Sequence, residues 1–363
     1  MALDDLPLRD DLRGQTPYGA PQLDVSVRLN TNENPHAPGS DVTSSIVARV
    51  AAAAAGLNRY PDRDSSELRA ALARYVKDRT GGQVGADQVW PANGSNEVLQ
   101  QILQAFGGPG RRAIGFEPSY SMHRLICRGT GTDYLALDRG PGFAVTAESV
   151  RTAIDEHDPD IVFLCTPNNP TGTTLALDVV EAAYVATRGV VVVDEAYAEF
   201  SESPSAVTLL PGRERLIVVR TLSKALELAG ARIGYAVANA SVVDALQLVR
   251  LPYHLSSITQ AVGMAALEHA DELLHWVEDL KVQRDRIAAT LEELGYDVCP
   301  SEANFVFFGG LADQTVLWQS LLDAGVLIRD VGVPGYLRVT AGTPDETDAF
   351  IEAIRTITKE TAA

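Results

Sequence analysis

Short apolar runs alternate with helix-like segments through the middle of the chain. Four runs rich in β-branched or other apolar residues lie at residues 113–116, 161–165, 190–193 and 216–219. Helical patterns lie between them, near 148–156 and 178–188 and just after residue 95. Continuous apolar strands separated by helices are typical of a parallel sheet with both faces covered. We therefore predict an α/β fold in which ligands bind at the carboxyl ends of the strands.

The segments on either side of this block have other patterns. The first 40 residues contain five prolines and no long periodic element, which indicates an extended arm. An alanine-rich pattern that Gly56 ends predicts a helix at 42–55, and apolar residues on one face predict another at 66–79.

Past residue 240 the pattern is mixed. It predicts a charged helix at 270–294, a strand at 304–308, a helix at 315–323, strands at 326–328 and 336–340, and a last helix from Pro344. We therefore expect three parts. These are an arm at 1–40 that joins the small domain, a large domain with a mostly parallel, helix-covered sheet at 41–250, and a smaller α+β domain at 251–363.

Composition excludes several classes of protein. The net charge is −18, with 48 acidic and 30 basic residues, whereas a nucleic-acid or anionic-membrane partner requires a basic surface. Cys127, Cys165 and Cys299 are odd in number and far apart, so neither a disulfide framework nor a zinc site is indicated, and we expect no metal. The acidic N-terminus does not resemble a signal peptide, and no run approaches a membrane span. We expect a cytoplasmic protein.

Unusual polar residues follow each of the four predicted strands. Tyr120 follows the first, Asn169 the second, Asp194 and Tyr197 the third, and Lys224 the fourth. Because the carboxyl ends of parallel strands meet at one edge of a sheet, these side chains are expected to converge. A planar, phosphorylated pyridine aldehyde would use all of them.

The Lys224 segment indicates the chemistry. A lysine on an apolar floor, with the hydroxyls of Thr221 and Ser223 beside it and Arg232 nearby, suits a Schiff base next to a bound phosphate. A helix beginning at Ser95 and Asn96 would present free N–H groups to that phosphate. The alternatives are a strand-end lysine that reaches solvent and an ordinary helix cap.

The other strand ends have comparable roles and alternatives. Asp194 could keep a pyridine nitrogen protonated, although it could also cap the segment that follows. Tyr197 and Asn169 could donate to the ring oxygen, and Asn169 also fits ordinary turn chemistry. Tyr120 could stack on the ring, or pack as a half-buried core tyrosine.

These residues resemble those of a known family. Asn169–Gly172, Asp194–Tyr197, and Ser223–Lys224 with Arg232 eight residues later are similar to the fold type I, aspartate-aminotransferase family of pyridoxal-phosphate enzymes. Five further segments more closely resemble the histidinol-phosphate aminotransferase branch, over nearly the whole chain: 29–35, 59–61, 223–235, 328–330 and 336–343. Two residues depart from the pattern: His123 stands at a usually aromatic or small position, and Glu227 at another.

The resemblance implies pyridoxal 5′-phosphate as cofactor and a role for each matched residue. Lys224 would form the Schiff base, Asp194 would pair with the ring nitrogen, and Tyr120 would stack on the ring. The other cofactor residues would be Ser95, Asn96, Asn169, Tyr197, Thr221, Ser223 and Arg232. Tyr60 would reach the cofactor phosphate of a neighbouring subunit, which implies a homodimer with shared sites. The substrate would contact Tyr18, Asn34, Arg329 and Arg338.

The implied reaction is transamination between L-histidinol phosphate and 2-oxoglutarate, a step of L-histidine biosynthesis. An aromatic amino-acid aminotransferase of the same family is the first alternative, and it would leave Arg329 without a phosphate to bind. A decarboxylase of the same fold is the second. A binding protein without catalysis is the third, and the intact Lys224 argues against it.

Overall fold

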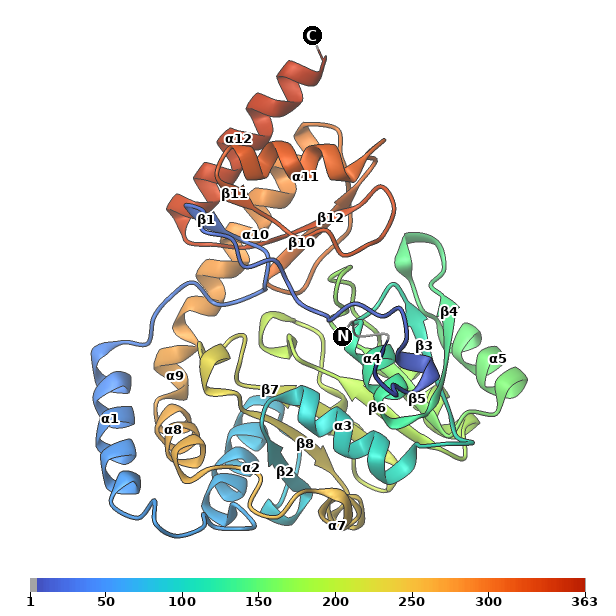
Figure 1. Cartoon of the computed structure of the whole chain (residues 1–363), viewed down its shortest axis with the longest axis vertical. Coiled ribbons are helices and arrows are strands. Elements are labelled where there is room, and N and C mark those ends of the chain that lie inside the picture. Colours follow the sequence, from blue (N-terminus) through green and yellow to red (C-terminus); the bar gives the residue numbers. More distant parts are fainter. Residues whose placement is uncertain (1–4, 363) are drawn as a thin grey trace.

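A seven-stranded sheet forms the centre of the larger part of the molecule (Figure 1), in a computed structural model that describes residues 5–362. In sheet order, the strands are β2 (Val89–Ala92), β8 (Gly234–Ala238), β7 (Leu216–Thr221), β6 (Val190–Asp194), β5 (Ile161–Cys165), β3 (Arg112–Glu117) and β4 (Asp133–Asp138). Neighbours pair in parallel, except that β8 is antiparallel to both β7 and β2. The predicted α/β class is confirmed, and so are the four predicted strands.

Helices cover both faces of this sheet, which explains why its central strands are apolar throughout. One face packs on α3 (Ser95–Phe106), α4 (Met122–Thr130) and α7 (Ala240–Val249). The opposite face packs on α2 (Ser66–Thr80), α5 (Ala147–His157), α6 (Leu177–Ala186) and α8 (Ser257–Glu268), with α1 (Ser40–Ala54) outside α8. Successive residues of β6 and β7 alternate between the two faces, as strand geometry requires.

The smaller part carries its own sheet and core. Its antiparallel strands are β9 (Asp297–Val298), β10 (Phe305–Gly309) and β12 (Leu337–Thr340). They pack with α10 (His275–Glu293), α11 (Gln314–Asp323) and α12 (Pro344–Ala362). The N-terminal arm adds β1 (Val27–Arg28), parallel to β11 (Val326–Leu327), and places Leu29 in this core.

The predicted helix at 270–294 has nearly the expected bounds, but it is divided at Leu274 into a short α9 (Ala270–Leu273) and α10. A separate helix, α8, ends just before it at His269, where φ is −113° and ψ is 25°. No glycine or proline lies at either break, so neither could be predicted from a local stop signal. α8 packs on α1 and α2 in the larger part. The predicted boundary between the large and small domains at residues 250/251 stays a prediction.

Short 3₁₀ turns join several of these elements, at Asp10–Leu12, Ala86–Gln88, Pro141–Phe143, Ala198–Phe200, Ala206–Leu209 and Ala229–Ala231. Among the helices described, none is both long and apolar enough to cross a membrane.

Candidate active site

A cavity of about 240 Å³ lies at the carboxyl ends of β5, β6 and β7, beneath the N-terminal arm. Its lining brings together thirteen of the residues predicted from the sequence: Tyr18, Ser95, Asn96, Tyr120, Asn169, Asp194, Tyr197, Thr221, Ser223, Lys224, Arg232, Arg329 and Arg338. They come from the arm, from α3, from the ends of four strands of the large sheet and the segments after them, and from the smaller part (Arg329 and Arg338), so only the folded chain makes them neighbours.

Lys224 points into this cavity. Its Nζ donates to the carbonyl oxygen of Thr31 at 3.1 Å and lies 5.9 Å from the centre of the Tyr197 ring. Burial, and then the positive charges of Arg338 and Arg232, lower the pKa of Lys224 to about 8. A strand-end lysine that reaches solvent would show neither contact, so the amine is held where it can act as a nucleophile and a base.

Asp194 forms the floor of the cavity and is only 1% exposed. Its Oδ2 lies 3.0 Å from Nε2 of His123, and its Oδ1 accepts from the backbone N–H of Ala196 at 3.2 Å. The His123 ring is stacked on Phe163 at 4.7 Å, which fixes its plane. Oδ1 therefore bonds within the turn after β6, which does not make Asp194 a helix cap because Tyr197 holds the N-cap position, while Oδ2 is paired with His123. From the sequence, His123 was noted only as a departure from the family pattern, with no role in the site.

A chain of amides connects Tyr197 to Arg338. The Tyr197 hydroxyl accepts from Nδ2 of Asn32 at 2.9 Å and from Nδ2 of Asn169 at 3.3 Å. Oδ1 of Asn169 accepts from Arg338 at 2.6 Å, and Arg338 also donates to the carbonyl oxygen of Asn30 at 2.9 Å. Asn30 and Asn32 were not among the predicted site residues, although both belong to the polar segment at 29–35.

Hydroxyls, a guanidinium and a helix N-terminus meet at one corner of the cavity. Thr221 Oγ1 lies 2.9 Å from Ser223 Oγ, and Arg232 lies 3.4 Å from the same oxygen. α3 begins after Gly94, which has no side chain to cap its first N–H groups. These groups together form a cradle for an anion.

Two glycines keep this corner open. A Cβ on Gly94 would lie 2.5 Å from the Arg232 guanidinium, and one on Gly234 would lie 2.1 Å from the backbone nitrogen of Ser95. Glu97 turns away from this corner, because its carboxylate accepts from the backbone and side chain of Asn93 at 2.5 and 2.6 Å. The residues that line this corner therefore include no negatively charged side chain that would repel an anion.

Two arginines lie at the other end of the cavity. The backbones of Arg329 and Arg338 pair with each other at 2.9 Å in both directions. Arg338 is 5% exposed, and burial is the main cause that lowers its pKa, to about 10. The Arg329 guanidinium donates to the carbonyl oxygen of Gly19 and lies 5.9 Å from the Tyr18 ring. The arm therefore covers this end.

Two predicted site residues lie outside the cavity. Asn34 donates to the carbonyl oxygen of Ala225 at 3.3 Å and accepts from the backbone of His36, so it fastens the arm to the Lys224 segment. Tyr60 is 79% exposed and stacks on Tyr253, with ring centres 4.4 Å apart. Neither residue faces the site of its own chain.

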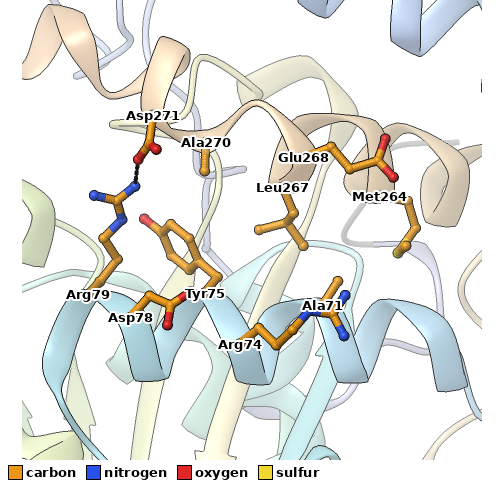
Figure 2. Close-up of a pocket in the computed structure, with 10 residues that line it drawn as sticks. All are labelled: Ala71, Arg74, Tyr75, Asp78, Arg79, Met264, Leu267, Glu268, Ala270 and Asp271. Carbon is orange, nitrogen blue, oxygen red and sulfur yellow. Dashed lines mark hydrogen bonds and ion pairs between the residues drawn. The ribbon is translucent and has the colours of Figure 1, made fainter.

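A larger hollow of about 420 Å³ lies elsewhere, between α2 and the α8–α9 segment (Figure 2). Its side chains are of mixed charge, and Arg79 pairs with Asp271 across it. It contains neither a lysine nor any of the predicted site residues. Within residues 5–362, no group of three or more histidine, cysteine or acidic side chains could hold a metal ion.

The site has counterparts in known proteins. A family model described as aminotransferase class I and II matches residues 25–354. A histidinol-phosphate aminotransferase of Frankia casuarinae is 61% identical over 98% of this chain and 91% of its own, and one of Paenarthrobacter aurescens is 59% identical over 99% and 97%.

A solved structure shares the fold. The histidinol-phosphate aminotransferase of Sinorhizobium meliloti, in complex with pyridoxal-5′-phosphate, superposes with a TM-score of 0.81 over 93% of this chain and 92% of its own, at 23% identity. The family model covers most of the chain, and a relative is 61% identical over 98% of it. The chain therefore belongs to the class I and II aminotransferase family.

Proposed function

We propose that the chain is a pyridoxal-phosphate-dependent aminotransferase that moves the amino group of L-histidinol phosphate to 2-oxoglutarate. The products would be 3-(imidazol-4-yl)-2-oxopropyl phosphate and L-glutamate. The observation that carries this proposal is one cavity that holds a partly buried lysine, a buried aspartate, an anion cradle and two arginines. The names of the relatives at 59–61% identity favour the substrate.

The residues present fit the cofactor. Its phosphate would lie in the cradle of Thr221, Ser223, Arg232 and the first N–H groups of α3, where two glycines leave the required room. When bound, pyridoxal phosphate supplies an aromatic ring that accepts the electron pair left after the α-proton of an amino acid is removed.

The residues around the ring have separate tasks. Asp194, held by His123, would keep a proton on the ring nitrogen, because a buried carboxylate favours a positive charge beside it. Tyr197 and Asn169 would donate to the ring oxygen, and Tyr120 would pack against the ring face. Ser95 and Asn96 would complete the phosphate contacts.

Lys224 would bind the cofactor and then carry the proton. A base must be within reach of the proton it takes and must be uncharged at the working pH. With a pKa of about 8, about a tenth of the Lys224 amine is uncharged at pH 7, far more than for an exposed lysine with its ordinary value of 10.5. The amine would remove the proton from the α-carbon of the substrate.

The arginines suit two anionic substrates that share one site. Arg338, held by Asn169 and Asn30, would bind the carboxylate of glutamate in a bidentate manner. Arg329 and Tyr18 would assist in binding the phosphate of histidinol phosphate at the same end. With a net charge of −18, the surface would not attract these anions, so the two arginines of the cavity must supply the attraction.

A homodimer is part of the proposal. Tyr60 is exposed and stacked on Tyr253, away from its own cavity, which fits a side chain that reaches the phosphate site of a second copy. The cytoplasmic location stays a prediction.

Substrate preference tests the proposed activity. We expect kcat/KM for histidinol phosphate to exceed that for phenylalanine by about 100-fold or more, because only the former has a phosphate for Arg329. A preference for phenylalanine would favour the aromatic aminotransferase instead. Release of carbon dioxide without 2-oxoglutarate-dependent amine exchange would indicate the decarboxylase.

A further inference from the structure

A buried ionic cluster lies beneath the proposed cofactor site, on the opposite face of the sheet. Arg220 is 3% exposed, with its Nε 3.4 Å from a Glu195 oxygen and a terminal nitrogen 3.7 Å from a Glu199 oxygen. Tyr75 on α2 donates its hydroxyl to the same Glu199 oxygen at 3.1 Å. None of these residues lines the cavity, so the proposed chemistry does not use them directly.

The members of this cluster are sequence neighbours of residues in the cavity. Arg220 immediately precedes Thr221 in β7, and Glu195 immediately follows Asp194 at the end of β6. Because successive strand residues face opposite sides, Thr221 and Asp194 face the cavity while Arg220 and Glu195 face the other way. The backbone of Glu195 also donates to the carbonyl oxygen of Val219 at 2.8 Å, which continues the pairing of β6 and β7.

The Glu195 carboxylate also has hydrogen-bond partners other than Arg220. Its two oxygens accept from the hydroxyl of Ser205 at 2.7 Å and from the backbone N–H of Ala206 at 2.6 Å. Tyr75, which anchors Glu199, also forms part of the wall of the hollow in Figure 2. Arg220 therefore lies between two carboxylates that other groups hold in place, one directly after β6 and one in the Ala198–Phe200 turn.

Stability alone does not explain such a cluster. Three charges removed from water incur a desolvation cost that their mutual attraction often fails to exceed, and apolar replacements of buried ion pairs are frequently neutral or stabilising. Burial opposes the charge on Arg220, but Glu199, Tyr235 and Glu195 outweigh it and raise its pKa, so the guanidinium stays charged. Geometry, rather than stability, is therefore the role to test for this cluster.

We propose that Arg220 is a positioning residue which, through Glu195, fixes the end of β6 relative to β7 and so sets the spacing between Asp194 and the Thr221–Lys224 segment. The role rests on the proposed cofactor site, whose existence is tested separately by cofactor binding to the unmodified protein. No contact between Arg220 and the cofactor or the substrate is required.

The test compares Arg220→Met with a matched control at the far end of the same strand. Arg215 donates to the carbonyl oxygens of Thr187 and Gly189 at 2.8 and 2.6 Å and lies outside the cavity. We expect both variants to lower the melting temperature of the cofactor-free protein. Only Arg220→Met should raise the Kd for pyridoxal phosphate, by about tenfold or more, because only it moves Asp194 relative to the phosphate cradle.

Two further readouts separate positioning from general destabilisation. In the cofactor-free protein, hydrogen exchange at the backbone of residues 194–196 and 221–224 should accelerate in Arg220→Met and not in Arg215→Met. In the bound protein, the pH midpoint of the cofactor's absorbance change should shift in Arg220→Met alone. Arg220→Lys, which keeps the charge, should recover part of the affinity.

Equal cofactor affinity in Arg220→Met and the unmodified protein would overturn the proposal, even if the variant melted earlier. Should Arg220→Met fail to fold, Glu195→Gln gives the same decision, because it removes the charge partner while keeping the bonds to Ser205 and Ala206 possible. An unmodified protein that bound no pyridoxal phosphate would contradict the cofactor site itself, an outcome distinguishable from the failure of Arg220 to position it.

Discussion

At the residue scale, the behaviour of the site depends on one lysine in an unfavourable place for its charge. Lys224 is one of four lysines in the chain, and burial, together with two nearby arginines, lowers its pKa. The charged form of this amine therefore lowers the stability of the folded protein, and we attribute its presence to function.

The first prediction concerns stability and pH. The pKa of Lys224 is about 8 when folded and 10.5 as the ordinary value, so between these pH values the unfolded chain holds a proton that the folded chain has lost. The free energy of unfolding therefore rises with pH across this window for the unmodified, cofactor-free protein. Lys224→Met should melt at a higher temperature at pH 7, and its advantage should shrink by pH 10. A constant advantage at all pH values would contradict the lowered pKa.

The second prediction concerns substrate binding at Arg338. Arg338→Lys keeps the charge but loses the planar fork that reaches Asn169 and Asn30. We expect kcat/KM for glutamate to fall by about 100-fold, corresponding to about 2.7 kcal/mol. Steady-state kinetics check this value. Arg286→Lys, on the surface of α10, is the control and should change neither kcat nor KM.

Much of the candidate site was predictable from single residues. Polar side chains after apolar strands carry a clear signal, since the sheet forces them to one edge, and Tyr120, Asn169, Asp194, Tyr197 and Lys224 all line the cavity. The arm has no such periodicity. Sequence alone could not show that its other asparagines, at 30 and 32, contact site residues while Asn34 bonds outside the cavity.

At the element scale, most predicted strands and helices are present, but two fully buried strands, β2 and β8, were not predicted. β2 contains Pro91 and β8 begins at Gly234, and both residue types weaken a strand pattern. The edge strand β4, which has partly exposed residues, and the helices α4, α7 and α8 were not predicted either. The close contact between β8 and the start of α3 joins segments far apart in the sequence, and it shapes the anion cradle.

The third prediction tests that contact. Gly234→Ala would place a Cβ 2.1 Å from the backbone nitrogen of Ser95, so α3 must shift away from Arg232. We expect a loss of about 1–3 kcal/mol in the free energy of unfolding and weaker binding of pyridoxal phosphate. Calorimetry and cofactor titration measure the two effects.

Gly230→Ala is the matched control for this change. It lies four residues away and meets no atom within 4 Å, so it should leave both quantities unchanged. Cofactor affinity that Gly234→Ala left intact would show that the approach of β8 to α3 does not shape the cradle.

At the scale of the whole molecule, the arm joins the two parts, since it adds a strand to the smaller sheet and contacts Lys224 through Thr31. One tyrosine, Tyr60, remains without a role in its own chain, and the proposed homodimer gives it one. This proposal has a direct test, because a shared site can be reconstituted from two defective subunits.

The fourth prediction is complementation by mixed dimers. Lys224→Ala and Tyr60→Ala each impair every site of a homodimer, whereas a mixed dimer has one site with both defects and one with neither. Unfolding and refolding equal amounts together should restore about a quarter of the unmodified activity, because half of the dimers are mixed and half of their sites are intact. Activity that stayed at the average of the two variants would contradict sharing.

Transfer of isotopic nitrogen tests the central claim most directly. Purified protein, pyridoxal phosphate, 2-oxoglutarate and histidinol phosphate labelled with ¹⁵N at its amine would be incubated and analysed by mass spectrometry. We expect one labelled glutamate for each histidinol phosphate consumed, and none with Lys224→Ala, while Lys281→Ala, on α10 and outside the cavity, behaves like the unmodified protein. Consumption of histidinol phosphate without labelled glutamate, or labelled glutamate from Lys224→Ala at the unmodified rate, would contradict the account.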